Sequence, residues 1–424
     1  MLQTSFIRDQ FDTALKGLNK RGLLHAEQLL NEILSLDEER RNTQKQLDDI
    51  LADSNKVAKN IGMLVKSGKK EEAEQAKQET TKLKVKAKEL GDKLSEVEDQ
   101  LTQALYNIPN VPHITVPDGK KPEDNEVVKE GGEKPILVKG AKPHWELIEE
   151  FDIIDFELGS KVAGAGFPFY KGKGARLNRA LINYFLDEAE KAGFKEIQPP
   201  ILINEDSGFG TGQLPDKEGQ MYQLVDTNLF MIPTAEVPIT NVYRNVILNE
   251  EDLPVKLAGY TPCFRREAGS WGAHVRGLNR LHQFDKVEIV QVSHPDHSYQ
   301  VLEEMVAHVE KLVSSLGLPY RILRLCGGDM GFTSALTYDF EVYSAAQEKW
   351  LEVSSVSNFE SYQANRLKLR IKGKEGKKML AHTLNGSALA LPRIVAALLE
   401  NNQEEVGIKI PEVLRPYTGF DIID

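Results

Sequence analysis

The sequence predicts an α+β protein, in which an antiparallel sheet flanked by helices follows an N-terminal antiparallel α-helical coiled-coil hairpin. Three observations predict this class. Residues 27–106 contain no proline and keep a 3–4 apolar spacing. From residue 107 the chain becomes rich in proline and glycine, as linkers are. After residue 145 short strand patterns alternate with isolated helix patterns, which is typical of antiparallel α+β domains.

The composition excludes several classes of protein. With 424 residues, 41 % of them hydrophobic and 28 % charged, the chain is long enough for two or three domains of ordinary globular type. The net charge of -11 argues against sequence-blind binding to nucleic acid, although a local basic element can still contact phosphates. The two cysteines, Cys263 and Cys326, have no histidine or cysteine at zinc spacing, so we expect free thiols and no structural zinc. No stretch resembles a signal peptide or membrane span, and we expect a cytoplasmic protein.

The hairpin is predicted from an apolar seam that repeats along residues 27–106. Gly68, within KSGKK, interrupts the pattern, and two helices joined by so short a turn must run antiparallel. About 38 residues in each helix, at 1.5 Å rise, give an arm of roughly 55 Å. The predicted seam positions are Leu47, Leu51, Ser54, Ala58, Ile61 and Val65 in the first helix, and Ala76, Thr80, Leu83, Ala87, Leu90, Leu94, Val97 and Leu101 in the second.

The outer half of this arm is basic. Between Ser54 and Lys88 there are ten lysines and four glutamates, which gives about six excess positive charges in an acidic protein. Such a run is compatible with a solvated helix face or with a probe for a phosphate backbone. The scarcity of aromatic residues favours recognition of duplex shape over stacking on single strands.

We place the domain boundaries where the composition of the chain changes. Residues 1–108 form an N-terminal domain with the arm at about 27–106, residues 109–144 form a linker region, and residues 145–424 form the α+β domain. Within the last, the predicted helices span 177–193, 296–316 and 392–402, and the predicted strands span 194–203, 229–232, 319–325, 336–344 and 349–355. The pair Pro199–Pro200 indicates an edge or an interface.

Residues 260–292 carry the densest set of reactive groups. Two alternating strands flank a cationic, glycine-rich loop, and alternation places Arg265 and Glu267 on one face and Arg266 on the other. In the second strand Phe284 and Glu288 share a face, roughly 13 Å apart. A ring, a guanidinium and carboxylates in a row suit a ligand with a base, a phosphate and an amine.

This stretch resembles motif 2 of the class II aminoacyl-tRNA synthetases, in the bacterial type of the seryl-tRNA synthetase family. Residues 177–200 resemble motif 1 and residues 384–403 resemble motif 3, so the resemblance covers nearly the whole chain. It implies that Arg265, Glu267 and Arg393 are catalytic. It further implies serine-binding residues Thr234, Ala235, Glu236, Arg265, Glu288 and Ser387; ATP-binding residues Arg265, Arg266, Glu267, Leu281, Phe284, Glu352, Val353, Ser354, Ser355 and Arg393; and metal-binding residues Glu352 and Ser355.

Two features of the sequence depart from this pattern. A regular strand would place Glu352 and Ser355 on opposite faces, so a shared Mg²⁺ requires the strand to end or bulge near Ser354. Ala388 and Pro392 stand where family members commonly have glycine, which leaves the backbone path at motif 3 open.

The resemblance implies a ligase that activates serine with ATP and Mg²⁺ and transfers it from seryl-adenylate to tRNA(Ser), and also to tRNA(Sec). It also implies a homodimer, without membrane association, whose loop 268–280 meets the acceptor end of tRNA. Three alternatives remain at this point: a catalytically silent homologue that binds tRNA or adenylate, a coiled-coil scaffold with an unrelated globular end, and a zinc-dependent threonine-specific relative. Which of Glu288, Ser387 and Thr234 meets the serine hydroxyl stays open.

Overall fold

The computed structural model describes residues 1–268 and 276–424, which form two compact units. One unit consists of Leu2–Asn19 and Leu23–Pro109 and is helical. The other contains Asn110–Asp424 and is built around a sheet. Among the described residues, no helix is both long enough and apolar enough to span a bilayer.

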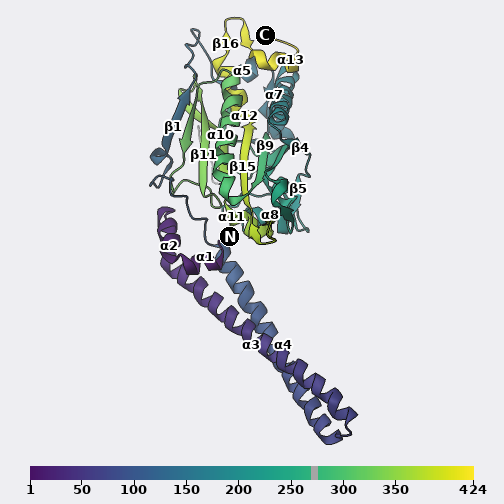
Figure 1. The fold of residues 1–424 in the computed structure, drawn as a ribbon. Helices are drawn as coiled ribbons and strands as arrows, with labels where there is room; N and C mark the ends of the chain where they lie inside the picture. Colours follow the sequence, from purple (N-terminus) through teal and green to yellow (C-terminus); the bar gives the residue numbers. More distant parts are fainter. Residues whose placement is uncertain (269–275) are drawn as a thin grey trace. The chain divides into compact units, whose positions relative to one another are not determined.

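The helical unit contains the predicted hairpin. Its helices are α1 (Thr4–Asp9), α2 (Phe11–Lys20), α3 (Ala26–Lys66) and α4 (Lys70–Tyr106) (Figure 1). The turn between α3 and α4 contains Gly68 at φ +78°, a left-handed conformation that glycine adopts without strain. An ion pair between Lys93 and Glu39 at 2.8 Å joins the two long helices. The predicted antiparallel hairpin is therefore confirmed.

The predicted seam is confirmed in α4 but half wrong in α3. In α4 every predicted seam position is buried or half-buried. In α3 the exposed residues include Leu51 (46 %) and Val65 (58 %), and Ala58 is exposed too. Their neighbours, which the structure shows half-buried instead, are Ile50, Val57 and Leu64. Each error is a shift of one residue between two adjacent apolar side chains, a choice that only the partner helix decides.

In the described chain the second unit has an eight-stranded central sheet. Its strands, in spatial order, are β1 (Glu126–Gly131), β10 (Tyr320–Arg324), β11 (Leu336–Ser344), β12 (Lys349–Asn358), β15 (His382–Ala390), β9 (Gln283–Ser293), β8 (Val255–Phe264) and β4 (Lys195–Glu196). Neighbours are antiparallel except β4 and β8. The antiparallel prediction is confirmed. Strand β1, which pairs with β10, lies within the region 109–144 that was expected to be linker.

The strand predicted at 194–203 is two short strands. β4 ends at Glu196, and β5 (Leu202–Asn204) belongs to a separate pair with β6 (Leu229–Met231). The break falls at Pro199–Pro200, because proline has no N–H to donate to a sheet. β4 is nevertheless an edge strand of the central sheet, as the prolines indicated.

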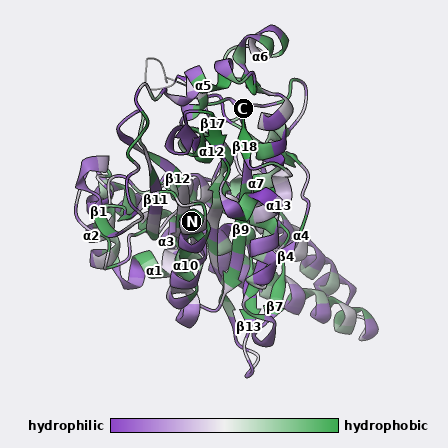
Figure 2. Ribbon diagram, turned by 90° about the horizontal axis from the view of Figure 1, so that it is seen from above, coloured by the Kyte–Doolittle hydropathy of each residue, from purple (hydrophilic) through white to green (hydrophobic). Residues whose placement is uncertain are grey.

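One face of the sheet is covered by three helices, α7 (Gly172–Lys191), α10 (Ser298–Ser315) and α12 (Leu391–Asn401) (Figure 1). Val287 and Ile289 of β9 pack into the core cluster that these helices share, and much of α12 is hydrophobic (Figure 2). Since side chains alternate along a strand, Lys286, Glu288 and Val290 point to the opposite face. Val290 there packs in a second, smaller cluster. The polar residues of β9 therefore lie on the face away from the three helices.

Smaller elements complete the second unit. They are α5 (His144–Glu150), α6 (Phe156–Val162), α8 (Glu205–Thr211), α9 (Glu236–Asn241), α11 (Ser361–Leu367), α13 (Arg415–Thr418), β2 (Ile154–Asp155), β3 (Phe169–Tyr170), β7 (Ile247–Asn249), β13 (Arg370–Lys372), β14 (Lys378–Leu380), β16 (Gln403–Glu404), β17 (Gly407–Lys409) and β18 (Ile422–Ile423).

Candidate active site

A buried carboxylate, Glu288, gathers the predicted serine-binding residues. The hydroxyl of Thr234 and the backbone N–H of Glu236 (2.9 Å) both donate to Glu288 Oε2. The hydroxyl of Ser387 donates to Oε1 at 3.3 Å, since β15 pairs Ser387 directly with Glu288. Lys286, two residues earlier on β9, forms an ion pair with Oε1 at 2.8 Å. Segments far apart in the sequence thus meet at one carboxylate.

The pKa values of the two carboxylates in this cluster, Glu288 and Glu236, are shifted in opposite directions. Burial alone would raise the pKa of Glu288, but the positive charge and hydrogen bond of Lys286, with the bonds from Thr234 and Glu236, lower it below its ordinary range. Burial and the nearby Glu288 raise the pKa of Glu236 to about 7, against which a 2.6 Å hydrogen bond from Gln363 acts. Separated pKa values of neighbouring acids are characteristic of functional sites.

Lys286 and Gln363 were not among the predicted site residues. Lys286 had a visible signal, since it shares the predicted face of Phe284 and Glu288. Its side chain is 7 % exposed, and such a buried ammonium needs a partner charge. Gln363 had no such signal, because its bond to Glu236 spans 127 positions of sequence.

Arg265 and Glu267 lie just beyond strand β8, not within it as predicted. The strand ends at Phe264, and one further ladder bond joins Arg265 N–H to the carbonyl of His282 at 3.0 Å. Glu267 has φ +48°, so strict alternation no longer applies there. Both groups still border the site: the Arg265 guanidinium lies 5.3 Å from the centre of the Phe284 ring, and Glu267 pairs with Arg280 at 2.9 Å.

The loop after Glu267 lies partly outside the described residues. Its predicted contact with tRNA concerns 268–280, of which 269–275 are not described. Arg266 is exposed, and its backbone N–H donates to the carbonyl of Gln220 at 2.8 Å.

Strand β12 has the bulge that the predicted metal pair requires. Glu341 of β11 faces Glu352, whereas the preceding Phe340 faces Ser354, so Val353 is an extra residue on β12. Both Phe340 and Val353 are buried in the core cluster of the helix-covered face. The shift places Glu352 and Ser355 on the same, opposite face, and Asp339 is the residue paired with Ser355.

Asp339 is a further acidic residue that the sequence prediction missed. Among the described residues, its buried Oδ1 has no hydrogen-bond partner. Burial, followed by the nearby charge of Glu352, raises the pKa of Asp339 well above its ordinary value. The alternation of LTYDFEVYS already separated Asp339 from the apolar face, which was the signal available in the sequence.

Arg393, on α12, contacts Glu352 of this acidic group. Its Nη1 donates to the carbonyl of Glu352 at 2.7 Å and lies 3.7 Å from Glu352 Oε2. Its Nε donates to the carbonyl of Asn279 at 3.1 Å. The side chain is 30 % exposed, which leaves part of the guanidinium open to a ligand.

The other predicted residues take no polar part through their side chains, or only a local one. Leu281, Val353 and Ala235 are buried in apolar clusters. Ser354 donates its hydroxyl to the carbonyl of Ser387 at 2.6 Å, which joins β12 to β15 beside the irregular pairing that follows Ser387.

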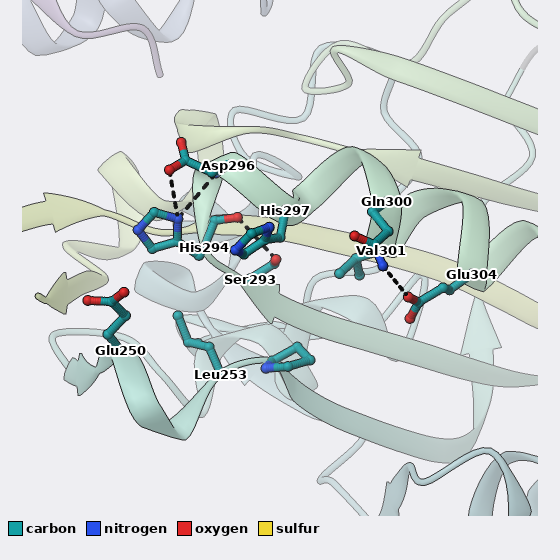
Figure 3. Close-up of a pocket in the computed structure, with 10 residues that line it drawn as sticks. Glu250, Leu253, Ser293, His294, Asp296, His297, Gln300, Val301 and Glu304 are labelled. Atoms are coloured by element: carbon teal, nitrogen blue, oxygen red, sulfur yellow. Dashed lines mark hydrogen bonds and ion pairs between the residues drawn. The ribbon is translucent and has the colours of Figure 1, made fainter.

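A separate pocket of about 500 Å³ opens between residues 250–254, which precede β8, the end of β9 and the start of α10 (Figure 3). Polar side chains dominate its lining, and His294 accepts a hydrogen bond from the backbone N–H of Asp296 at 3.3 Å. None of the predicted site residues lines this pocket.

The comparisons with known proteins agree with this arrangement. Residues 222–402 match the tRNA synthetase class II core domain (G, H, P, S and T), and residues 1–112 match the seryl-tRNA synthetase N-terminal domain. A serine–tRNA ligase of Salinibacter ruber is 49 % identical over 422 residues, which cover 99 % of this chain and 98 % of the relative. The chain belongs to the seryl-tRNA synthetase family.

Two further members of the seryl-tRNA synthetase family support the assignment. A serine–tRNA ligase of Akkermansia muciniphila is 46 % identical, covering 100 % of this chain and 99 % of the relative. The solved seryl-tRNA synthetase of Pyrococcus horikoshii superimposes with a TM-score of 0.91 at 34 % identity, covering 100 % and 99 % of the two chains.

Membership confirms the predicted fold class and the predicted activity. The chain is an aminoacyl-tRNA ligase for serine with a class II core. The alternatives of a silent homologue, an unrelated scaffold and a threonine-specific relative are therefore excluded.

Proposed function

We propose that the buried cluster around Glu288 binds L-serine, and that the chain activates it with ATP and Mg²⁺ to seryl-adenylate before transfer to the 3′ end of tRNA(Ser). The observation that carries this proposal is the convergence of Thr234, Glu236, Glu288 and Ser387 on one buried polar centre beside Arg265. The ATP complex of the Pyrococcus horikoshii relative supports ATP as the co-substrate.

The charges of the cluster suit the amino acid. Lys286 compensates one of the two carboxylates, that of Glu288, so a serine ammonium finds a carboxylate to neutralise at Glu236. For the serine hydroxyl we favour Glu288 as acceptor. Its bond from Ser387, at 3.3 Å, is the weakest of its contacts and is readily exchanged for one from the substrate. Ala235 has a fully buried side chain and can contribute only through its backbone.

The chemical step is an in-line displacement at the α-phosphorus of ATP. A carboxylate oxygen of serine forms the new P–O bond, and the bond to the β-phosphate oxygen breaks, so pyrophosphate leaves with the electron pair. In this proposal Arg265 bridges the serine carboxylate and the α-phosphate, because its planar fork reaches two oxygens. Phe284 stacks on the adenine, Glu267 orients the nucleotide, and Arg393 binds the γ-phosphate.

The residues on β11 and β12 fit a magnesium ion. Glu352, Ser355 and Asp339 lie on one face and offer hard oxygen ligands, which Mg²⁺ prefers. The buried, unpartnered Oδ1 of Asp339 is the observation that points to a cation, since an acceptor left in that state is costly. When bound there, the ion supplies positive charge to the phosphates of ATP.

The test of activation is serine-dependent ATP–pyrophosphate exchange, run with serine, threonine, alanine and cysteine. Only serine is expected to support rapid exchange. Arg265→Ala should lower the rate about 1,000-fold, because a charged donor to the developing phosphate charge is lost. Arg370→Ala, an exposed arginine of β13, is the matched control. Exchange that does not depend on serine contradicts the proposal.

We further propose that the basic outer half of the α3–α4 hairpin binds the tRNA. All ten of its lysines between Ser54 and Lys88 are exposed, as contacts to a phosphate backbone require. Deleting residues 55–86 and closing the gap with a short glycine-containing turn should abolish charging of tRNA(Ser) and spare pyrophosphate exchange. Equal survival of both activities rules this role out.

The remaining proposals concern assembly, compartment and a second tRNA. We propose a homodimer formed through the motif 1 region, where α7 leads into the edge strand β4 and Pro199–Pro200. We also propose that the enzyme charges tRNA(Sec) and that it is located in the cytoplasm. Sedimentation of the intact chain tests the first. A monomer at micromolar concentration contradicts it. Charging of a tRNA(Sec) transcript tests the second, and cell fractionation tests the third.

A further inference from the structure

A fully buried histidine, His144, has both ring nitrogens engaged at the start of α5. Its Nδ1 lies 2.7 Å from Glu400 Oε1, and its Nε2 lies 2.9 Å from the backbone nitrogen of Leu278. A backbone N–H only donates, so Nε2 is the acceptor and carries no proton. The proton of the neutral ring is then on Nδ1 and points to Glu400. The hydrogen bonds thus define a single tautomer.

The turn that His144 contacts is pressed against the ring. Gly277 has φ +67°, and a Cβ built on it would lie 2.3 Å from His144 Nε2. Any larger residue there pushes the turn Gly277–Asn279 off the imidazole. Arg276, the residue before Gly277, packs on the next residue of α5: its guanidinium lies 5.0 Å from the centre of the Trp145 ring. The segment that returns from the motif 2 loop is therefore docked on the first two residues of α5.

A second route connects the same turn to Glu400. Asn279 donates from Nδ2 to Gln347 Oε1 at 3.1 Å, and Gln347 donates from Nε2 to Glu400 Oε1 at 2.8 Å. Together with His144 and Leu278 these bonds close a ring around the turn. Burial would raise the pKa of Glu400, but bonds from His144 and Ser344 hold it below the ordinary range, so the carboxylate stays a charged acceptor.

The last residue of the turn, Asn279, contacts the motif 3 arginine, Arg393. The carbonyl of Asn279 accepts from Arg393 Nε at 3.1 Å, and Arg393 reaches Glu352 with Nη1. The guanidinium has one fixed contact on the turn and one on β12. A change in the position of the turn therefore changes the direction of the guanidinium.

We infer that His144, held by Glu400, is a positioning residue for Arg393: by fixing the turn Gly277–Asn279 it aims the arginine at the γ-phosphate of ATP. The inference rests on the proposed role of Arg393. It concerns a residue outside motifs 1, 2 and 3, at the boundary of the region first expected to be linker.

A pair of near-isosteric variants separates the two functions of the ring. Asparagine places an amide N–H near the Nδ1 position and keeps a donor to Glu400, whereas glutamine places a carbonyl near the Nε2 position and keeps an acceptor for Leu278. His144→Asn should weaken ATP binding about tenfold, as expected for the loss of one buried hydrogen bond, and His144→Gln less than about threefold. Binding of AMP, which lacks the γ-phosphate, should stay the same in both, as should the KM for serine.

The measurements are calorimetric titration with ATP and with AMP, and steady-state pyrophosphate exchange. His382→Asn is the matched control: this histidine is half-buried, and its Nδ1 bonds to Ser298 at 2.8 Å. It should lower the melting temperature without changing ATP affinity. If His144→Asn and His144→Gln weaken ATP equally, or weaken AMP as much as ATP, the inference is overturned.

Gln347→Met keeps the inference testable if the His144 variants do not fold. Gln347 is only half-buried, and methionine matches its length without its hydrogen bonds. A loss of ATP affinity of about threefold without loss of AMP affinity is expected for the weaker of the two routes. Unchanged ATP affinity overturns the inference. Arg393→Ala serves as the reference: if it leaves ATP affinity unchanged, the proposed role of Arg393 fails first.

Discussion

The lysines of the arm and the lysine of the sheet show two opposite uses of one residue type. In the outer arm all ten lysines are exposed, and pairs such as Lys77–Glu74 are formed between exposed neighbours along one helix. In the sheet the Lys286 side chain is 7 % exposed and Glu288 is 1 % exposed, at 2.8 Å. Exposed pairs contribute little to stability, whereas a buried pair that loses one partner becomes strongly unfavourable. The difference supports the proposals that charge in the arm acts on a partner, whereas charge in the sheet acts within the candidate site.

Removing Lys286 should give the largest effect. Lys286→Met leaves Glu288 buried without its cation, at a cost of about 3–5 kcal/mol in unfolding free energy. Lys84→Met, in the arm, should change the unfolding free energy by less than about 0.5 kcal/mol. Chemical denaturation of both variants measures the contrast. Serine-dependent exchange should fall at least 100-fold in Lys286→Met, since burial then raises the pKa of Glu288 without the opposing charge of Lys286. Equal stability of the two variants contradicts the comparison.

The same comparison shows what a sequence can and cannot predict. The arm was predictable because its signal is local, with an apolar residue every three or four positions and a glycine at the turn. The error at Leu51 and Val65 arose where two adjacent apolar residues fit the repeat equally well, and only the opposite helix selects between them.

The residues of the candidate site could be proposed from residue type and motif order, but their geometry could not. The bulge at Val353 depends on the pairing with β11, which no local pattern encodes. Gln363 and His144 were missed because their partners are more than 100 positions away. Lys286 and Asp339 could have been found by asking which charged side chains share a face with the predicted residues.

Reversing charge at the arm should have the next largest effect, confined to tRNA. Changing Lys82, Lys84 and Lys86 to glutamate removes three exposed cations and adds three anions. The kcat/KM for tRNA(Ser) should fall about 100-fold at low salt, and the salt dependence should flatten because fewer counterions are released. Charging assays at several salt concentrations measure this. The same changes at Lys374, Lys377 and Lys378 around β14 are the control, and an equal loss there means that the arm has no special role.

A smaller, pH-dependent effect should follow from Glu236. Burial and Glu288 raise the pKa of Glu236 from an ordinary 4.5 to about 7. Its stabilising contribution is therefore complete below pH 4.5 and is lost as the pH rises through about 7, a total loss of about 3 kcal/mol. Glu236→Gln should remove this slope from the plot of unfolding free energy against pH. The KM for serine should fall a few-fold between pH 6 and pH 8 in the parent, as the carboxylate ionises. An unchanged slope in Glu236→Gln assigns the titration to another group.

Replacing Asp339 should give the smallest effect, a rise in stability together with a loss of Mg²⁺ affinity. Asp339 is buried near Glu352, its Oδ1 has no partner among the described residues, and both factors disfavour its charge. Asp339→Asn removes that charge without changing the shape, so the unfolding free energy at pH 7 should rise by about 1 kcal/mol. The Mg²⁺ concentration for half-maximal pyrophosphate exchange should rise several-fold at the same time, since a hard anionic ligand is lost. Glu341→Gln, on the same face of β11 but paired with Arg321, is the control and should lower stability slightly with no change in Mg²⁺ dependence. If Asp339→Asn instead destabilises the protein, contacts within the fold stabilise the carboxylate. Its charge would then contribute to stability, unlike the exposed charges of the arm.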